Sequence, residues 1–221
     1  MSVYLILGAG KFGRLAVHRL PSKDAGAGLV VVDQDPRALK EARAEAPHAV
    51  TWIQAEAIGY LVEHLQAVPP WDWLLPMLPV HLAYEWLRRG GGLEGGWLTV
   101  PVPEALEALA PVAFRGKEGQ LYLSRARHLC PDDCPEPPEG CPVSGRHWER
   151  PLFAELGRLA LPGWHLVVIR SRQLAPGIGG YPPQVLWDLA EQAKQVPPGE
   201  GLLVGTACAC HGVVHAVMRE Q

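Results

Sequence analysis

The feature that most constrains the fold of this chain is a glycine-rich turn near its N-terminus. Residues 3–7 form an apolar run of strand length, and residues 8–13 have the spacing G-x-G-x-x-G. Residues 14–20 predict a helix, and the apolar run 29–32 predicts a second buried strand that leads into Asp33. A strand, a glycine turn, a helix and a second strand that ends in an acid together predict a dinucleotide-binding βαβ unit.

Each glycine of this turn has a separate expected role. Gly8 permits the tight turn, Gly10 lets a pyrophosphate approach the backbone, and Gly13 lets the helix pack closely on the sheet. Asp33 would accept a hydrogen bond from a ribose 2'-hydroxyl and repel a 2'-phosphate, which favours NAD, although Arg37 lies close enough to leave NADP open. The alternative is that the glycines only form a tight turn in a fold without a ligand.

These residues also carry a family resemblance. Residues 6–13, followed by residues 31–36 (Val-Val-Asp-Gln-Asp-Pro), resemble the N-terminal nucleotide-binding domain of the TrkA/RCK proteins. The resemblance covers residues 1–45. Proteins of that family gate potassium transport and bind NAD or related nucleotides. The resemblance implies phosphate contacts at Gly8, Gly10, Lys11, Phe12 and Gly13, and a ribose contact at Asp33.

Strand-like and helix-like segments alternate in the rest of the N-terminal half. We expect helices over residues 36–46, 57–66 and 80–89, and strands near residues 49–53, 71–76 and 97–100. This alternation predicts an α/β fold with a Rossmann-like, doubly wound parallel sheet and a cofactor at its carboxyl edge. We place this domain at residues 1–111 and a smaller Cys-rich α/β domain at residues 112–221. The second domain should contain a hairpin over residues 113–123, strands at 165–169 and 202–207, and helices at 149–159 and 183–194.

Composition argues against several functions. The 221 residues include 20 Lys and Arg against 23 Asp and Glu, a net charge of −3, so nucleic acid is not an expected partner. Proline interrupts the apolar residues 73–80, and no segment reaches the ~20 apolar residues of a membrane span. The N-terminal apolar run has no cationic region before it and leads directly into the glycine turn. It is therefore not a signal peptide, and we expect a cytoplasmic protein.

Five cysteines form two clusters in the C-terminal half. Cys130, Cys134 and Cys141 are each followed by proline, in a stretch of Pro, Gly, Asp and Glu that cannot form a packed core. Cys208 and Cys210 follow the strand at 202–207 and would point to one side of an extended chain. A reducing compartment favours metal ligands or redox thiols over disulfides, and a bound metal would order the loop. We therefore predict a metal site formed by these cysteines.

The spacing of the cysteines leaves the metal open. An iron–sulfur cluster is favoured because thiolate-only ligation suits it and a nucleotide cofactor would supply an electron partner. The alternative is structural zinc, held by Cys130, Cys134, Cys141 and either Cys210 or His211. A third option is a set of reduced thiols or a disulfide in a flexible loop.

Two classes of function follow from these sites. The first is an NAD(H)-binding redox protein, an oxidoreductase or electron-transfer protein with a Cys-ligated metal centre. The second, which the TrkA/RCK resemblance implies, is a nucleotide-sensing regulatory protein with a structural zinc site. The chain has no P-loop and no nucleophile-elbow motif. The sequence leaves open the catalytic residues, the small-molecule substrate or electron partner, and the oligomeric state, for which a homodimer is one option.

Overall fold

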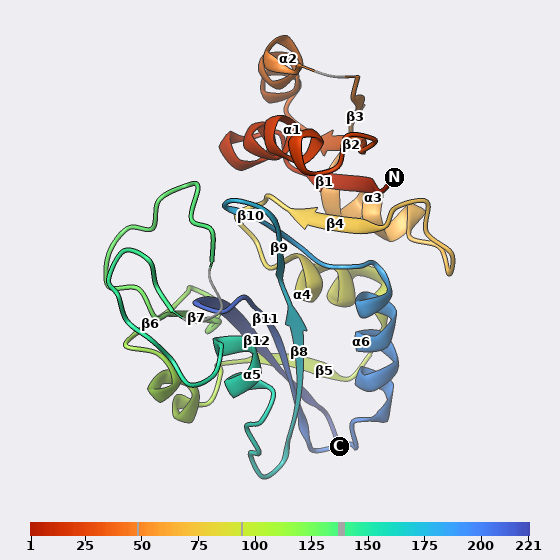
Figure 1. The fold of residues 1–221 in the computed structure, drawn as a ribbon. Coiled ribbons are helices and arrows are strands. Elements are labelled where there is room, and N and C mark those ends of the chain that lie inside the picture. Colours follow the sequence, from red (N-terminus) through yellow and green to blue (C-terminus); the bar gives the residue numbers. More distant parts are fainter. Residues whose placement is uncertain (48, 94, 137–139) are drawn as a thin grey trace. The chain divides into compact units, whose positions relative to one another are not determined.

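The computed structural model describes the chain except for residues 48, 94 and 137–139. The chain forms two compact units (Figure 1). Unit 1 comprises Met1–Gly91 and Arg172–Trp187, and unit 2 comprises Gly92–Ser171 and Asp188–Gln221. The division therefore differs from the boundary at residue 111 expected from the sequence. Residues 92–111 belong to unit 2, and a later segment returns to unit 1.

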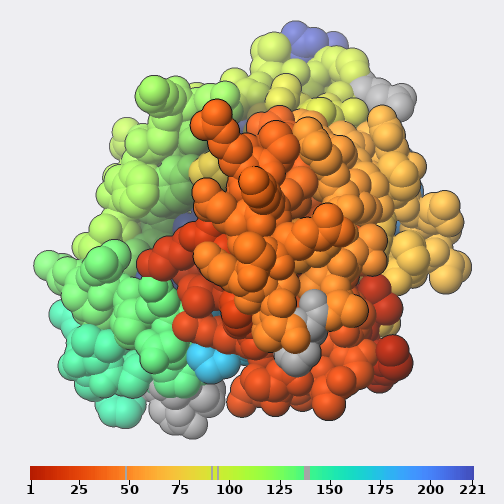
Figure 2. Space-filling view, turned by 90° about the horizontal axis from the view of Figure 1, so that it is seen from above, coloured from red at the N-terminus to blue at the C-terminus, as the bar shows by residue number. Residues whose placement is uncertain are grey.

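Unit 1 contains a four-stranded parallel sheet with the strand order β3-β2-β1-β4. Its strands are β1 (Val3–Leu7), β2 (Gly28–Asp33), β3 (Thr51–Gln54) and β4 (Trp73–Pro76). The segments between and after them form α1 (Lys11–Lys23), α2 (Pro36–Glu45), α3 (Ala57–His64), α4 (Leu82–Trp86) and the π-helix η1 (Leu87–Gly91). Figure 2 shows this unit with its N-terminal residues, red to orange, facing the viewer. The fold of unit 1 is thus the mixed α/β type that the alternating pattern predicts.

The core of unit 1 explains the apolar run at its start. Leu5, Ile6 and Leu7 are fully buried in the central strand β1, whose successive side chains point to opposite faces. One of these faces packs with the buried side of α1, which includes Val17 and Leu20. Burial on both faces is typical of parallel strands covered by helices.

Local capping chemistry fixes where two helices of unit 1 begin. The carboxylate of Asp35 accepts a hydrogen bond from the Arg37 backbone N–H at 2.9 Å, and Pro36 occupies the first position of α2. The carboxylate of Glu56 accepts from the backbone N–H groups of Ile58 and Gly59 at the start of α3. Both helices therefore begin within a residue of the positions that the sequence predicts.

A later segment of the chain completes unit 1. It forms an antiparallel hairpin of β9 (Arg172–Ala175) and β10 (Ile178–Gly180), and then the start of α6 (Gln184–Gln195). The backbones of Leu74 and Tyr181 exchange two hydrogen bonds, Leu74 N–H to Tyr181 O at 2.9 Å and Tyr181 N–H to Leu74 O at 3.1 Å. This bridge attaches the hairpin to the β4 side of the sheet.

Unit 2 contains a six-stranded mixed sheet. The order β6-β7-β12-β11-β8 is extended by β5, which also pairs with β12. Its elements are β5 (Trp97–Val100), the 3₁₀-helix η2 (Glu104–Leu109), β6 (Val112–Arg115), β7 (Leu121–Ser124), α5 (Leu152–Leu156), β8 (Trp164–Arg170), β11 (Gly201–Ala207) and β12 (His211–Arg219). The β6–β7 hairpin and the strands β8 and β11 lie where the sequence predicts them.

The prediction that residues 97–100 add a fifth strand to the parallel sheet was wrong. Strand β5 instead pairs antiparallel with the second half of β12, from Ala216 to Arg219. The first half of β12, from His211 to Val214, pairs with β7. The long C-terminal strand β12 therefore pairs with two short strands, with β7 along its first half and with β5 along its second half.

The cysteine-rich segment is irregular, as its composition predicts. Between β7 and α5 the described residues contain no helix and no regular strand, and Figure 1 shows this stretch as a long green loop. An isolated bridge between Gly140 and His147 is one of its few backbone pairings. Among the residues that the structure describes, none of the helices has the length and apolar character needed to cross a membrane.

Candidate functional site

The glycine turn of unit 1 gives each glycine the packing that its expected role requires. Gly8 has a φ of +112°, and a Cβ there would lie 2.5 Å from the carbonyl oxygen of Met77. A Cβ on Gly13 would lie 2.0 Å from the Gly8 carbonyl oxygen. A Cβ on Gly10 would meet no atom within 4 Å. Gly8 and Gly13 are thus required by the fold itself, whereas Gly10 borders open space where a ligand could approach.

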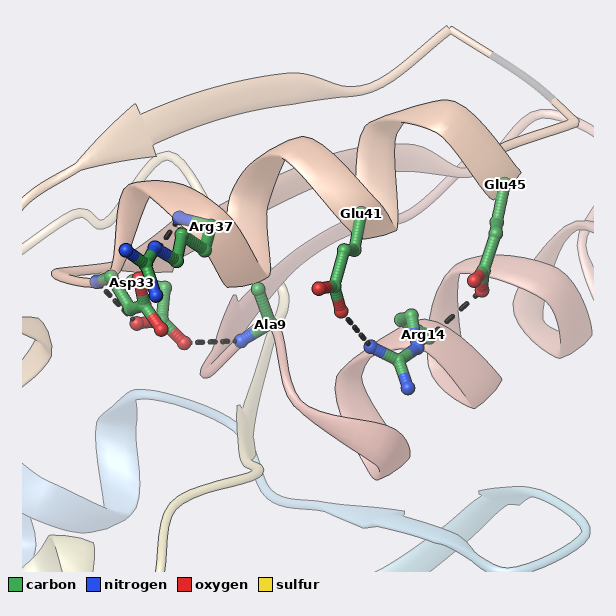
Figure 3. A network of polar contacts seen from close by, with 7 residues as sticks. Ala9, Arg14, Asp33, Arg37, Glu41 and Glu45 are labelled. Atoms are coloured by element: carbon green, nitrogen blue, oxygen red, sulfur yellow. Dashed lines mark hydrogen bonds and ion pairs between the residues drawn. The ribbon is translucent and has the colours of Figure 1, made fainter.

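Asp33 fixes the geometry of the turn from the end of β2. Its Oδ2 accepts a hydrogen bond from the Ala9 backbone N–H at 2.7 Å, and its Oδ1 accepts from the Asp35 N–H at 2.8 Å (Figure 3). An ionised carboxylate has about four acceptor positions, so about two remain for hydroxyl groups. Figure 3 also shows the Arg37 side chain near this carboxylate.

The first turn of α1 leaves room for an anion. Gly10 is the N-cap and gives no side-chain cap, and the first turn contains no acidic residue. Lys11 lies 5.5 Å from the ring centroid of Phe12, whose side chain is 43% exposed. Arg14 instead contacts Glu41 at 3.3 Å and Glu45 at 3.4 Å, and so ties α1 to α2 (Figure 3). Free backbone N–H groups at a helix N-terminus are suited to bind phosphate.

In unit 2 the two cysteine clusters approach each other through His211. The Sγ of Cys130 lies 3.5 Å from His211 Nε2, and the Sγ of Cys208 lies 3.9 Å from His211 Nδ1. A second pair joins Cys141 Sγ and His128 Nε2 at 3.8 Å. All five cysteines are free thiols in this structure. These contacts bring Cys130 of the loop and Cys208, which follows β11, to the same histidine.

A turn between β11 and β12 holds the sulfur of Cys208. This sulfur accepts hydrogen bonds from the backbone N–H groups of Cys210 at 3.4 Å and His211 at 3.3 Å. The two donors lie two and three positions after the cysteine, and Gly212 follows them. Backbone N–H donors to sulfur favour a thiolate over a neutral thiol.

The loop contains a similar turn at Cys141. The Ser144 side chain, followed by the backbone N–H groups of Ser144 and Val143, holds the pKa of Cys141 below its usual value. Gly145 follows with a φ of +65°. Hydrogen-bond donors thus favour a thiolate at a cysteine of the loop as well as at Cys208.

Neighbouring thiols shift the pKa values of these cysteines in opposite directions. A hydrogen bond from the Cys210 thiol holds the pKa of Cys208 well below its usual value, and the same bond raises the pKa of Cys210. Burial and the neighbouring Cys134, Cys141 and Cys208 raise the pKa of Cys130.

Glu136 is a further member of this group. Burial, followed by the charge of Cys208, raises the pKa of Glu136 to about 7. Its Oε1 accepts a hydrogen bond from the Ala209 backbone N–H at 2.6 Å. Sequence reasoning missed Glu136 and His128, because neither residue lies in a recognisable spacing with the cysteines.

The structure does not by itself identify a metal centre in the thiol cluster. Within the described part of the chain, no three Cys, His, Asp or Glu side chains are arranged to hold a metal ion. The Cys–His contacts are pairwise, although their separations are close to the about 3.6 Å expected between sulfur and nitrogen ligands of one tetrahedral zinc. The metal centre therefore stays a prediction.

The chain thus consists of two α/β units, one with a glycine turn and one with a cysteine-rich loop. Residues 75–220 match the family AF_1314_C, described as "Uncharacterized protein, C-terminal domain", and the chain belongs to that family. The chain is also similar to a protein of Archaeoglobus fulgidus described as "Uncharacterized protein". The two are 29% identical over 229 residues, which cover 97% of this chain and 99% of the relative. No solved structure matches the chain significantly. The TrkA/RCK resemblance concerns residues before the family match and stays a prediction.

Proposed function

We propose that this protein binds NAD(H) in unit 1 through a Rossmann-like dinucleotide site. The single observation that carries the proposal is the contrast within the glycine turn. Gly8 and Gly13 are packed against backbone, whereas Gly10 faces open space at the start of α1. In dinucleotide sites these are the positions of the tight turn, the close helix packing and the pyrophosphate.

The sheet and Asp33 support the same proposal. The strand order β3-β2-β1-β4 matches the first four strands of the dinucleotide-binding fold. Asp33 ends β2 beside the turn and keeps acceptor positions for a ribose 2'-hydroxyl. Its negative charge would repel a 2'-phosphate, and Arg37 is the residue that could offset this repulsion. The site would therefore hold pyrophosphate at Gly8, Gly10, Lys11, Phe12 and Gly13, and the ribose at Asp33.

We further propose that the cysteines of unit 2 hold a metal, which makes the protein a redox protein if the metal is iron. The backbone N–H donors to the Cys208 sulfur support thiolate ligation, because such donors stabilise the anionic sulfur, and the lowered pKa of Cys141 favours a thiolate there too. Cys130 lies within electrostatic range of Cys134, Cys141 and Cys208. Thiolates this close together repel each other, and a bound cation would offset the repulsion. An iron–sulfur cluster held by these cysteines would supply one-electron redox chemistry.

A second candidate is a nucleotide sensor with structural zinc. The observation that favours it is the pairing of sulfur with imidazole nitrogen, at Cys130 with His211 and at Cys141 with His128. Mixed sulfur and nitrogen ligation is typical of zinc. In this case NAD or a related nucleotide would bind without being consumed, as the TrkA/RCK resemblance implies.

Calorimetric titration with NAD, NADH, NADP and ATP tests the dinucleotide site. We expect NAD or NADH to bind at least about tenfold more tightly than NADP, a difference of about 1.4 kcal/mol. Arg37→Gln should widen this difference, whereas Arg43→Gln, which changes the same charge later in α2, should not. Absence of binding by every dinucleotide would overturn the proposal.

Elemental analysis and an optical spectrum after anaerobic purification test the metal. Iron with acid-labile sulfide supports the redox protein, and NADH oxidation with ferricyanide as acceptor should then be measurable. Stoichiometric zinc without visible absorption supports the sensor. Cys141→Ser and Cys208→Ser should lose the metal, whereas Cys210→Ser should retain it, because hydrogen-bond donors favour a thiolate at Cys141 and Cys208 and not at Cys210. Wild-type protein without any metal would overturn this part of the proposal.

A further inference from the structure

Unit 2 contains a pocket of about 570 Å³ next to the cysteine-rich loop. We call it the arginine pocket. Its polar lining consists of Arg125, Arg146, His147, Trp148, Arg150 and Arg158, together with Glu155. Apolar side chains, among them Leu109 and Leu159, complete the wall. The pocket therefore combines several guanidinium groups with a hydrocarbon surface.

The positive charge of this pocket is only partly neutralised. Arg125 forms an ion pair with Glu155, the one carboxylate in the lining. Arg146, Arg150 and Arg158 form no ion pair with any residue that the structure describes. The lining thus carries three exposed guanidinium groups without an ion-pair partner among the described residues, in a chain whose net charge is −3. Such a concentration of positive charge is suited to attract an anion.

Trp148 contributes its ring to the same lining. The Arg125 guanidinium lies 5.3 Å from the centroid of the Trp148 ring and holds it by a cation–π contact. The indole Nε1–H of Trp148 is shielded from solvent, so a ligand in the pocket would contact the ring and not this donor.

We propose that the arginine pocket binds a small organic anion that carries a carboxylate or phosphate group. Guanidinium forks bind both of these oxyanions in a bidentate manner. The anionic group would contact Arg146, Arg150 and Arg158, and the carbon skeleton would lie on the apolar wall.

The pocket borders the proposed metal centre within unit 2. The backbone N–H of Cys141 donates to the carbonyl oxygen of Arg146 at 2.8 Å, so a pocket residue is bonded to a cysteine of the thiol cluster. A substrate held there would lie beside that cluster. The anion site shares no residue with the glycine turn, so anion binding and NAD binding can be tested independently.

The test is a calorimetric titration of the full-length chain at constant ionic strength. The probes are inorganic phosphate, phenyl phosphate, acetate and benzoate, with chloride as the background anion. We expect phenyl phosphate or benzoate to bind at least about tenfold more tightly than inorganic phosphate or acetate, because the ring adds apolar contact. The stronger of the two aromatic anions identifies the ligand as a phosphate or a carboxylate.

Variants localise the binding. Arg150→Gln and Arg158→Gln should each weaken it by about tenfold. Arg127→Gln is the matched control, because Arg127 is exposed, lies in the same unit and is not part of the lining. NAD affinity should be unchanged in every variant, which separates this test from that of the proposed function. Equal weakening by Arg127→Gln, or no binding of any probe to the wild-type chain, would overturn the proposal.

Discussion

Replacing Gly10 by alanine separates the folding role of the glycine turn from its binding role. The Gly10 backbone has φ −68° and ψ −163°, which alanine also adopts, and the added Cβ would meet no atom within 4 Å. Alanine restricts the unfolded chain and so stabilises by about 0.4–1 kcal/mol. As an N-cap it is worse than glycine by an amount of similar size, up to about 1 kcal/mol. We therefore expect the free energy of unfolding to change by less than about 1 kcal/mol.

The same methyl group should damage nucleotide binding. A pyrophosphate bound to the N-terminus of α1 must approach the Gly10 backbone closely, and the Cβ would occupy part of that space. We expect Gly10→Ala to weaken NAD binding by at least about tenfold, or about 1.4 kcal/mol.

Urea unfolding and calorimetric titration measure the two effects on one preparation. A variant that keeps wild-type stability and loses NAD affinity agrees with the account. Wild-type affinity for NAD in Gly10→Ala would refute the reasoning, because no pyrophosphate could then lie against this residue. A large loss of stability would show that the space beside Gly10 is needed by the fold.

Three further predictions concern stability. Gly13→Ala should lower the free energy of unfolding by at least about 1–3 kcal/mol in urea, because its Cβ would lie 2.0 Å from the Gly8 carbonyl oxygen; an unchanged midpoint would contradict this packing. Burial lowers the pKa of His215 from 6.5 to about 4, so between these pH values the unfolded chain binds a proton that the folded chain does not bind. The free energy of unfolding should therefore fall by up to about 3 kcal/mol as the pH drops from 6.5 to 4. His215→Leu should flatten that part of the pH profile, and an identical profile in the variant would exclude His215 as its source. Tyr181→Phe should leave thermal stability unchanged or raise it, because the buried Tyr181 hydroxyl has no partner among the described residues; a loss above about 1 kcal/mol would mean that the hydroxyl is bonded.

The sequence predicted the N-terminal βαβ unit well because its signals are local. Apolar runs, the glycine spacing and the Asp35-Pro36 helix start each depend on neighbouring residues, and β1, β2 and α2 lie where they were expected. The pairing of β5 depends instead on a strand at the other end of the chain. The sequence of residues 97–100 is compatible with a strand in either sheet. Its pairing with β12 places it in the sheet of unit 2.

The candidate sites show the same limit. The packing of Gly8 and Gly13 could be predicted from spacing, because the glycine turn is a local structure. The approach of His211 to Cys130 could not, since it depends on how an irregular loop meets a hairpin turn far along the chain. The arginine pocket has no sequence signature either, since its residues come from three separate segments.

Hydrogen–deuterium exchange of the full-length chain, with and without saturating NAD, tests the central claim most directly. Exchange reports the protection of individual backbone amides, and the proposed site uses amides of the glycine turn and of the first turn of α1. The account predicts that NAD slows exchange in residues 8–13 and 33–37, with no comparable change in β5 or β12. Slower exchange elsewhere without any change in residues 8–13, or no change anywhere in the chain, would contradict it.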